Sequence, residues 1–139
     1  MHKKFQLETL PKVNTPNFVM SPVELKDYLD FEVKRAYFIS QPQGDTNQHC
    51  HFIEKEFFIM VQGSCIAIID KGNGKEEVPF VSPTSALYVP NYVWHGFIHL
   101  SPDAIILALS STNYTPDRSD YLEHYEEYLK IRDEKLKVQ

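Results

Sequence analysis

The sequence predicts a mainly β protein, a sandwich or barrel of short strands, followed by one C-terminal α-helix. Short apolar or alternating runs follow one another closely between residues 31 and 110. Residues typical of tight turns separate these runs: Gly63, Lys71-Gly72-Asn73-Gly74, Ser82-Pro83 and Ser101-Pro102-Asp103. Many short strands with turns between them are typical of sandwiches and barrels. After about residue 117 the apolar spacing becomes that of a helix.

The composition indicates an ordinary globular protein. The 139 residues suit one domain, which we expect to span 1–139. The formal net charge is −5, so we expect no nucleic-acid partner, because binding that backbone needs a concentrated basic face. No apolar run is long enough for a signal peptide or a membrane span, so we also expect no membrane partner. Cys50 and Cys65 lie in apolar runs, and buried free thiols fit a cytoplasmic location.

The N-terminal segment is expected to hold one short strand and one short helix. Phe5 to Leu7 fits a strand. Ser21-Pro22-Val23-Glu24 matches a capping box with proline at the first helical position, which predicts a helical turn or two from Ser21 to about Leu29. A short extended segment would fit the same residues.

The run from Phe31 to Ile39 alternates, which predicts a strand with one inner face. The residues that share this face are Phe31, Val33, Arg35, Tyr37 and Ile39. Arg35 therefore lies among apolar neighbours, where a charge is costly unless it is paired or used. Two interpretations stay open for it: a pair with a carboxylate at a barrel end, or a contact with a ligand.

The later strands and the helix follow from the same patterns. We expect strands at 57–61, 65–70, 75–81, 87–89, 95–100 and 104–110. The β-barrel would then occupy about residues 1–112. The amphipathic helix would run from Asp117 to about Lys137, because Leu122, Tyr125, Leu129, Arg132 and Leu136 recur at helical spacing.

His49 and His51 are the first candidates for chemistry. Alternate residues of a strand point to the same face, so both imidazoles would project together. Glu56 follows five positions after His51, and Gly63 closes the stretch. His95, which follows Pro90 at a distance of five, could bring a third imidazole to the same place.

These residues form two motifs that resemble those of the cupin superfamily. The first is G-x4-H-x-H-x4-E-x6-G from Gly44 to Gly63, and the second is P-x4-H from Pro90 to His95. Cupins are small jelly-roll β-barrels. The resemblance therefore implies a single cupin domain with a jelly-roll barrel and the C-terminal helix.

A closer resemblance covers nearly the whole chain. The segments that carry it are Val33-Lys34-Arg35-Ala36-Tyr37, His49-Cys50-His51, Gly63-Ser64-Cys65, Leu87-Tyr88-Val89-Pro90, Trp94-His95 and Asp120-Tyr121. In these segments the chain is similar to the cupin-type dTDP-sugar 3,4-ketoisomerases of bacteria, the WxcM-like cupins. The family converts a dTDP-4-keto-6-deoxyhexose to its 3-keto isomer in the biosynthesis of unusual deoxy and amino sugars.

The resemblance implies roles for particular side chains. A base removes the acidic proton at C3, an enediol forms, and a proton returns at C4. His51 would be the base and His49 its acid or shuttle partner, although the two roles are exchangeable. Tyr37 joins them as the third catalytic candidate. The expected substrate contacts are Arg35, Trp94, His95, Glu56 and Asn17, the last from the N-terminal segment that helps set epimer specificity in this family.

The chain departs from the family at four places. Thr46-Asn47-Gln48 stands where an arginine-glycine pair is common, and Phe52 stands where a lysine is usual. Glu56 replaces a frequent glutamine, and Gly96 replaces the glutamate of a WHE triplet. The first two changes remove cations that usually contact phosphate, and the last removes a residue linked to sugar stereochemistry.

Three readings of function remain. We favour the ketoisomerase, with a dTDP-linked keto sugar as its substrate, no cofactor and a homodimeric assembly. The second is a metal-dependent cupin enzyme, because His49, His51, Glu56 and His95 form a complete set of ligands for iron, manganese, nickel or zinc. The third is a sugar-binding cupin without catalysis.

Overall fold

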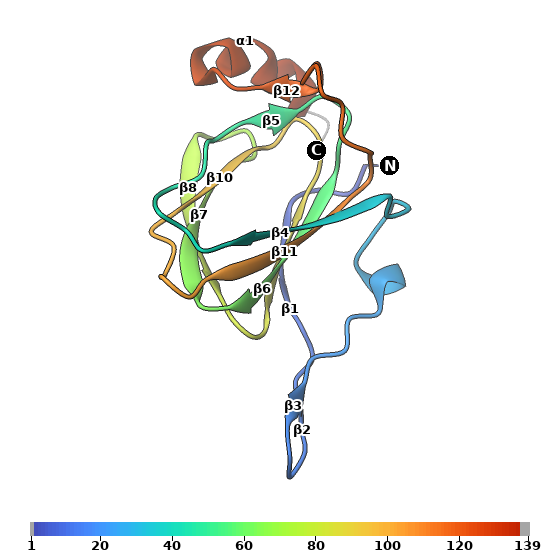
Figure 1. Cartoon of the computed structure of the whole chain (residues 1–139). Coiled ribbons are helices and arrows are strands. Elements are labelled where there is room, and N and C mark those ends of the chain that lie inside the picture. The colour runs from blue at the N-terminus through green and yellow to red at the C-terminus, as the bar shows by residue number, and fades with distance from the viewer. Residues whose placement is uncertain (1, 137–139) are drawn as a thin grey trace.

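The computed structural model describes residues 2–136, and its strands form two facing layers (Figure 1). The larger layer is an antiparallel sheet of five strands in the order β1-β9-β6-β11-β4. Their bounds are β1 Gln6–Thr9, β9 Ser85–Val89, β6 Glu56–Gln62, β11 Ile105–Ser110 and β4 Arg35–Ser40. This sheet supplies one wall of the interior.

The opposite wall is built from two smaller sheets. Strands β10 (Trp94–Ile98), β7 (Ser64–Asp70) and β8 (Lys75–Val81) form a three-stranded sheet. Strand β5 (Cys50–His51) pairs with β12 (Tyr121–Leu122). Two backbone hydrogen bonds between His49 and His95, of 3.0 and 2.9 Å, join the segment before β5 to β10. The bridge between His49 and His95 thus connects the two-stranded sheet to the three-stranded sheet.

The predicted fold class is confirmed: the chain is mainly β and carries a C-terminal helix, α1 (Tyr125–Leu136). The predicted barrel needs one correction. In residues 2–136 the strands form separate hydrogen-bonded sheets that face each other, and they do not close into one continuous ring. The two layers are therefore held together by the side chains packed between them.

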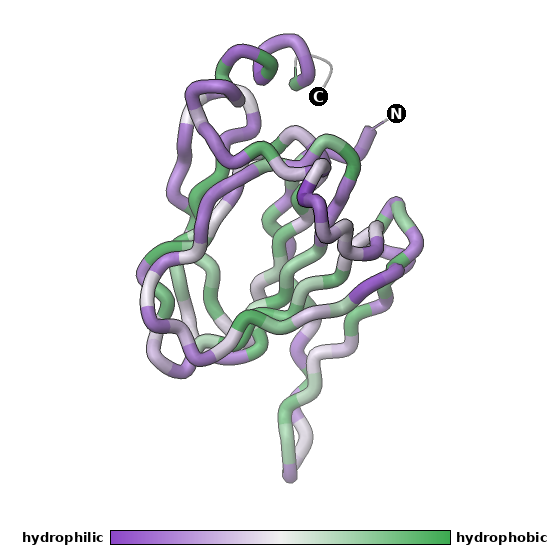
Figure 2. The backbone as a smooth tube through the Cα atoms, turned by 45° about the horizontal axis from the view of Figure 1, so that its top comes forward, coloured by the Kyte–Doolittle hydropathy of each residue, from purple (hydrophilic) through white to green (hydrophobic). Residues whose placement is uncertain are grey.

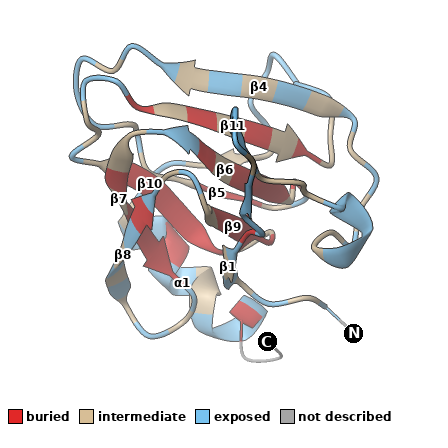
Figure 3. Ribbon diagram, turned by 90° about the horizontal axis from the view of Figure 1, so that it is seen from below, coloured by how far each residue is buried: buried red, intermediate tan, exposed pale blue. Residues whose placement is uncertain are grey.

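Alternation along the strands fills the space between the layers. On β4 the inward residues are partly buried and the outward ones exposed, as predicted from the run 31–39. Phe58 and Met60 of β6 enter the main core, whereas Phe57 points to the outer face and packs near Tyr88. Figure 2 shows apolar residues along the strands, and Figure 3 shows buried residues concentrated in β6, β7, β9, β10 and β11.

The predicted turn at Gly63 joins β6 to β7, and it requires glycine. Its φ is +81°, in the left-handed region that side chains disfavour. A Cβ at this position would also lie 2.9 Å from the Cα of Ala104. Gly63 therefore allows the sharp turn by which the chain passes from β6 of the large sheet to β7 of the opposite layer.

Two helix predictions are corrected. Helix α1 begins at Tyr125 and not at Asp117, because Tyr121 and Leu122 pair with His51 and Cys50 as a strand. Its expected end near Lys137 lies outside the described residues. In the N-terminal segment only a three-residue 3-10 helix, η1 (Leu25–Asp27), is present, and no side chain caps it. The proposed cap at Ser21 is therefore wrong.

Helix α1 is attached to the sheet through Asp70, a buried carboxylate at the end of β7. Asp70 accepts hydrogen bonds from the Tyr125 hydroxyl at 2.6 Å and from Arg132 at 3.2 Å. The backbone N–H of Gly72 donates to its other oxygen at 2.8 Å. These bonds outweigh the cost of burial and lower the pKa of Asp70, so the carboxylate is held in its charged form.

A hairpin of β2 (Val13–Asn14) and β3 (Val19–Met20) projects away from the two layers (Figure 1). Phe18, Val19 and Met20 are exposed on it. Among residues 2–136 no helix is both long and apolar enough to cross a membrane.

Candidate active site

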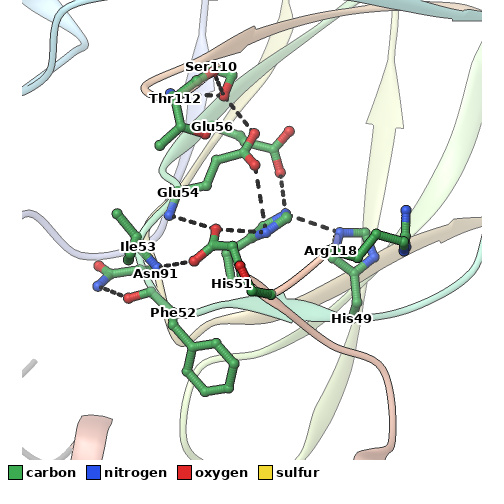
Figure 4. Close-up of polar contacts among 12 residues, drawn as sticks. His49, His51, Phe52, Ile53, Glu54, Glu56, Asn91, Ser110, Thr112 and Arg118 are labelled. Atoms are coloured by element: carbon green, nitrogen blue, oxygen red, sulfur yellow. Dashed lines mark hydrogen bonds and ion pairs between the residues drawn. The ribbon is translucent and has the colours of Figure 1, made fainter. Parts of the chain in front are cut away.

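The two histidines of the first motif point into the interior as a pair. His51 lies on β5 and His49 immediately precedes it, and their Nε2 atoms are 3.1 Å apart (Figure 4). Their ring centroids are 4.7 Å apart with an interplanar angle of 83°. The predicted common face is therefore correct, and a single proton can be shared between the rings.

His95 joins them from β10, as the second motif predicts. Its ring centroid lies 4.7 Å from that of His49 and 5.7 Å from that of His51. Its Nδ1 is 3.0 Å from the carbonyl oxygen of Val93. A carbonyl only accepts, so Nδ1 carries the proton and Nε2 presents its lone pair to the interior when the ring is neutral.

Glu56 faces the three histidines from β6, which belongs to the opposite layer. Its Oε1 lies 3.2 Å from Nε2 of His51 and 3.3 Å from Nε2 of His95. The Tyr37 hydroxyl of β4 donates a hydrogen bond to Oε2. Burial opposes the charge on Glu56, but its contacts with the two histidines outweigh that cost and hold its pKa well below the usual range. Burial and the Glu56 charge raise the pKa of Tyr37 well above its normal value.

Two further carboxylates approach the other nitrogen of His51, and sequence patterns did not point to either. Asp120 Oδ2 lies 3.2 Å from Nδ1, and Glu54 Oε1 lies 3.5 Å from it. Neither contact has the geometry of a straight hydrogen bond. Three carboxylates thus surround one imidazole that is 3% exposed.

This asymmetry separates the two histidines electrostatically. Burial acts to lower the pKa of His51, but contacts with Asp120 and Glu56 outweigh it and raise the pKa to about 9. Burial and the neighbouring histidines lower the pKa of His49 to about 2. Of the two rings, His51 is therefore the one whose surroundings favour the protonated form.

Arg35 pairs with a carboxylate, which was one of the two interpretations left open. Its guanidinium donates to Glu54 Oε2 at 2.9 Å, and the Ser110 hydroxyl donates to the same oxygen at 2.5 Å. Arg35 also borders a cavity of about 150 Å³ together with Tyr114 and Tyr121. Its Nε makes no hydrogen bond within the described chain, so the same side chain keeps a donor free.

Tyr121 covers the histidine pair on the side of this cavity. Its ring centroid lies 4.6 Å from that of His51 and 5.0 Å from that of His49. The Arg118 guanidinium lies 4.0 Å from the centre of the Tyr121 ring. On the other side, a cavity of about 60 Å³ opens next to His49 and His95. Its lining also includes Tyr37, Ile39, Thr46, Asn47, Phe58, Gly96 and Phe97.

Two predicted contact residues do not meet this cluster within the chain. Trp94 precedes His95 and points to the opposite side of β10, where its ring packs on Tyr125 and Tyr128 of α1 at centroid distances of 5.1 and 5.3 Å. Asn17 is exposed in the loop between β2 and β3, on the hairpin that projects from the sheets. The expected pocket wall at Trp94 is thus part of the packing under the helix.

Gly96 and Gln48 form a close contact beside the smaller cavity. A Cβ at Gly96 would lie 2.4 Å from Cγ of Gln48 and 3.1 Å from its Cα. The Gln48 side-chain oxygen accepts the indole N–H of Trp94 at 3.0 Å. Glycine is therefore required at 96 as long as Gln48 keeps this position.

The donor atoms of His49, His51, Glu56 and His95 all lie within 4.8 Å of one another. Bond lengths of about 2.0–2.2 Å around tetrahedral zinc place neighbouring ligand atoms roughly 3.3 Å apart, close to the separations seen here. These residues thus fit a divalent transition metal. His51, Glu54 and Asp120 form a second, overlapping group.

An acid–base cluster of histidines, tyrosine and carboxylate enclosed between two antiparallel jelly-roll layers defines a cupin-type enzyme. Comparison with known proteins narrows this class. The family model described as FdtA: WxcM-like, C-terminal, matches residues 3–133, and the chain belongs to this family. The predicted resemblance to the ketoisomerase cupins is thereby confirmed.

Individual relatives agree with the family. The chain is 32% identical over 110 residues to a TDP-4-oxo-6-deoxy-α-D-glucose-3,4-oxoisomerase of Aneurinibacillus thermoaerophilus, covering 78% of each protein. The solved WlaRB TDP-quinovose 3,4-ketoisomerase of Campylobacter jejuni matches with a TM-score of 0.81 and 26% identity, over 93% of this chain and 99% of that one. The WlaRA TDP-fucose-3,4-ketoisomerase of the same organism matches with a TM-score of 0.79 and 25% identity, over 95% and 98%.

Proposed function

We propose that the protein is a sugar 3,4-ketoisomerase that converts a dTDP-4-keto-6-deoxyhexose into the dTDP-3-keto-6-deoxyhexose. The relatives named above are 3,4-oxo- or ketoisomerases of TDP-linked sugars. The reaction removes the C3 proton, passes through an enediol, and returns a proton to C4. It is an internal redox change of the sugar, so it needs acid–base groups and no external oxidant.

The observation that carries this proposal is the 3.1 Å contact between Nε2 of His49 and Nε2 of His51. His51 takes the C3 proton as general base, and His49 moves protons between the sugar oxygens as its acid or shuttle partner. The Tyr37 hydroxyl donates to Glu56 in the free protein, and we propose that it turns from Glu56 to the developing enediolate when substrate is bound. A base and an acid within one hydrogen bond of each other suit a proton that leaves one carbon and reaches the next.

We place the sugar in the cavity beside His49 and His95. Tyr37 and Asn47 line the same space, so the cavity offers polar groups to the hydroxyls of a sugar. Arg35 borders the second cavity, and we place the diphosphate beside this cation. It takes over from the arginine and lysine that this chain lacks in the segment from Thr46 to Phe52.

We also propose a homodimer in which a partner supplies the missing contact of Asn17. Within one chain the hairpin projects away from the histidines and exposes Phe18, Val19 and Met20. Phe38, on the outer face of the large sheet, is 67% exposed as well. Apolar surfaces of this kind favour a second copy as their cover. The buried free thiols of Cys50 and Cys65 support a location in the cytoplasm.

The test is exchange of solvent deuterium. We expect the purified protein, with dTDP-4-keto-6-deoxyglucose in D2O, to place deuterium at C4 of the 3-keto product, as detected by NMR. His51→Asn should lower this rate at least about 10³-fold, because the ring that takes the proton is gone. His99→Asn is the matched control: His99 is exposed and has φ +54°, which asparagine tolerates. Full exchange in His51→Asn would refute the assignment of the base.

One further measurement distinguishes the metal-dependent enzyme from the metal-free isomerase. A general base needs its lone pair free, so we expect a chelator to leave the exchange rate unchanged and added zinc to inhibit. Loss of activity after chelation, restored by one metal and accompanied by that metal in elemental analysis, would replace acid–base catalysis by a metal centre at the same four residues.

A further inference from the structure

We infer that Asp120 is a positioning residue for the isomerase reaction: it holds Nδ1 of His51 so that Nε2 faces His49 and the sugar cavity. The inference rests on the proposed function. Asp120 borders the second cavity, together with Arg35, and is absent from the lining of the cavity beside His49 where we place the sugar. It therefore acts on the reacting atoms through the His51 ring.

The carboxylate of Asp120 is fixed before it meets the histidine. Its Oδ1 accepts the backbone N–H of Ile53 at 2.7 Å, and its Oδ2 accepts the backbone N–H of Glu54 at 3.1 Å. The side chain is 12% exposed. Oδ2 also lies 3.2 Å from Nδ1 of His51. Two backbone donors therefore determine where this oxygen lies.

The backbone around Asp120 is fixed as well. Its carbonyl oxygen accepts the N–H of Phe52 at 3.2 Å. The next residue, Tyr121, pairs with His51 in the short ladder of β12 and β5. Asp120 and His51 are thus attached to the same two-stranded unit, and their separation does not depend on a flexible loop.

Glu54 is the rival for this role, and it is the more distant of the two carboxylates from Nδ1. Its Oε2 is occupied by the Arg35 guanidinium and the Ser110 hydroxyl. Its Oε1 stays 3.5 Å from Nδ1, farther than Asp120. Glu54 therefore holds Arg35, while Asp120 is the nearer acceptor for the histidine.

The chemical consequence concerns the tautomer of His51. A carboxylate only accepts, so it keeps a proton on Nδ1 and leaves the lone pair of the neutral ring on Nε2. Nε2 is the atom that faces His49 at 3.1 Å and Glu56 at 3.2 Å. The contact to Asp120 falls short of a straight hydrogen bond here, and such bonds tighten when substrate binds.

The experiment is Asp120→Asn, with Asp117→Asn as the matched control. The new amide keeps its oxygen for the Ile53 N–H and turns its N–H2 toward Nδ1, which favours the tautomer with its proton on Nε2. The variant also loses the hydrogen bond from the Glu54 N–H, so its Tm is measured alongside its kinetics. We expect kcat to fall about 10²–10⁴-fold with KM changed less than about threefold, as for carboxylates that orient catalytic histidines. Asp117 is exposed in the same segment and accepts only the Ser119 N–H, so its variant should keep both constants.

Histidine-labelled ¹⁵N NMR supplies a readout that general destabilisation would not move. At a pH high enough for the His51 ring to be neutral, we expect it to carry its proton on Nδ1 in the wild-type protein and on Nε2 in Asp120→Asn. Should the variant fail to fold, the wild-type spectrum decides alone, and a proton on Nε2 overturns the inference. Wild-type kcat in Asp120→Asn also overturns it. A wild-type protein without isomerase activity but with the Nδ1 tautomer would refute the proposed function and leave the positioning of His51 standing.

Discussion

Asp70 and Glu56 are both carboxylates removed from solvent, with exposures of 0% and 1%, and their surroundings differ completely. Asp70 accepts hydrogen bonds of good geometry from Tyr125, Arg132 and Gly72. At Glu56, Oε1 lies near two histidine nitrogens without forming a regular hydrogen bond to either one. The first carboxylate is satisfied within the protein, and the second is only partly satisfied.

The difference separates a structural cluster from a reactive one. A buried charge whose hydrogen-bond partners are all present stabilises one geometry and keeps its protonation state. A buried charge with an incompletely paired oxygen keeps its neighbours ready for a proton or a ligand, at some cost in stability. On this comparison, changes near Asp70 should affect folding, and changes near Glu56 should affect chemistry.

The largest expected effect is the pH dependence at the reactive cluster. The pKa of His51 is raised to about 9, so the neutral ring that acts as base becomes more abundant as the pH rises. We expect kcat/KM to increase about tenfold per pH unit below 9 and to level off above it. A rate that is constant at neutral pH and falls above 9 would instead make His51 the acid and His49 the base.

The next effect is on stability at the structural cluster. Asp70→Asn keeps an oxygen for the Gly72 N–H but removes the charged acceptor of Tyr125 and Arg132. We expect a loss of about 2–3 kcal/mol in the free energy of unfolding, seen as a fall in Tm of several degrees. The exchange rate of the folded protein should stay within about twofold of wild type. A selective loss of activity at unchanged Tm would break the comparison.

The smallest effect is expected for Glu56→Gln. The glutamine has the same shape and accepts the Tyr37 hydroxyl, so Tm should not fall. It removes a negative charge that raises the pKa of His51, so the rising limb of the kcat/KM profile should move to lower pH. A profile that does not move would show that Asp120 and Glu54 alone set the basicity of His51.

Much of the fold follows from local patterns. Alternation predicted the inner face of β4, and the turn at Gly63 follows from a backbone angle that glycine adopts easily. The start of α1 could not be read in this way, because Leu122 fits the helical spacing and yet pairs with Cys50. Long-range strand pairing overrode the local period there.

The site could be predicted from local patterns only in part, because some of its residues are placed by long-range contacts. His49, His51, Glu56 and His95 converge because strand alternation and the two motifs specify their faces. Asp120 was missed because its position depends on backbone amides 66 and 67 residues away. Trp94 was placed on the wrong side, although the alternation that turns His95 inward already turns its neighbour outward.

The contact between Gly96 and Gln48 constrains how this enzyme can diverge. A side chain at 96 collides with Gln48, and a shorter residue at 48 leaves the Trp94 indole without its acceptor. Either single replacement is therefore expected to disturb the packing at this wall of the cavity. Descendants with a different preference at this wall of the cavity should therefore differ at both positions together.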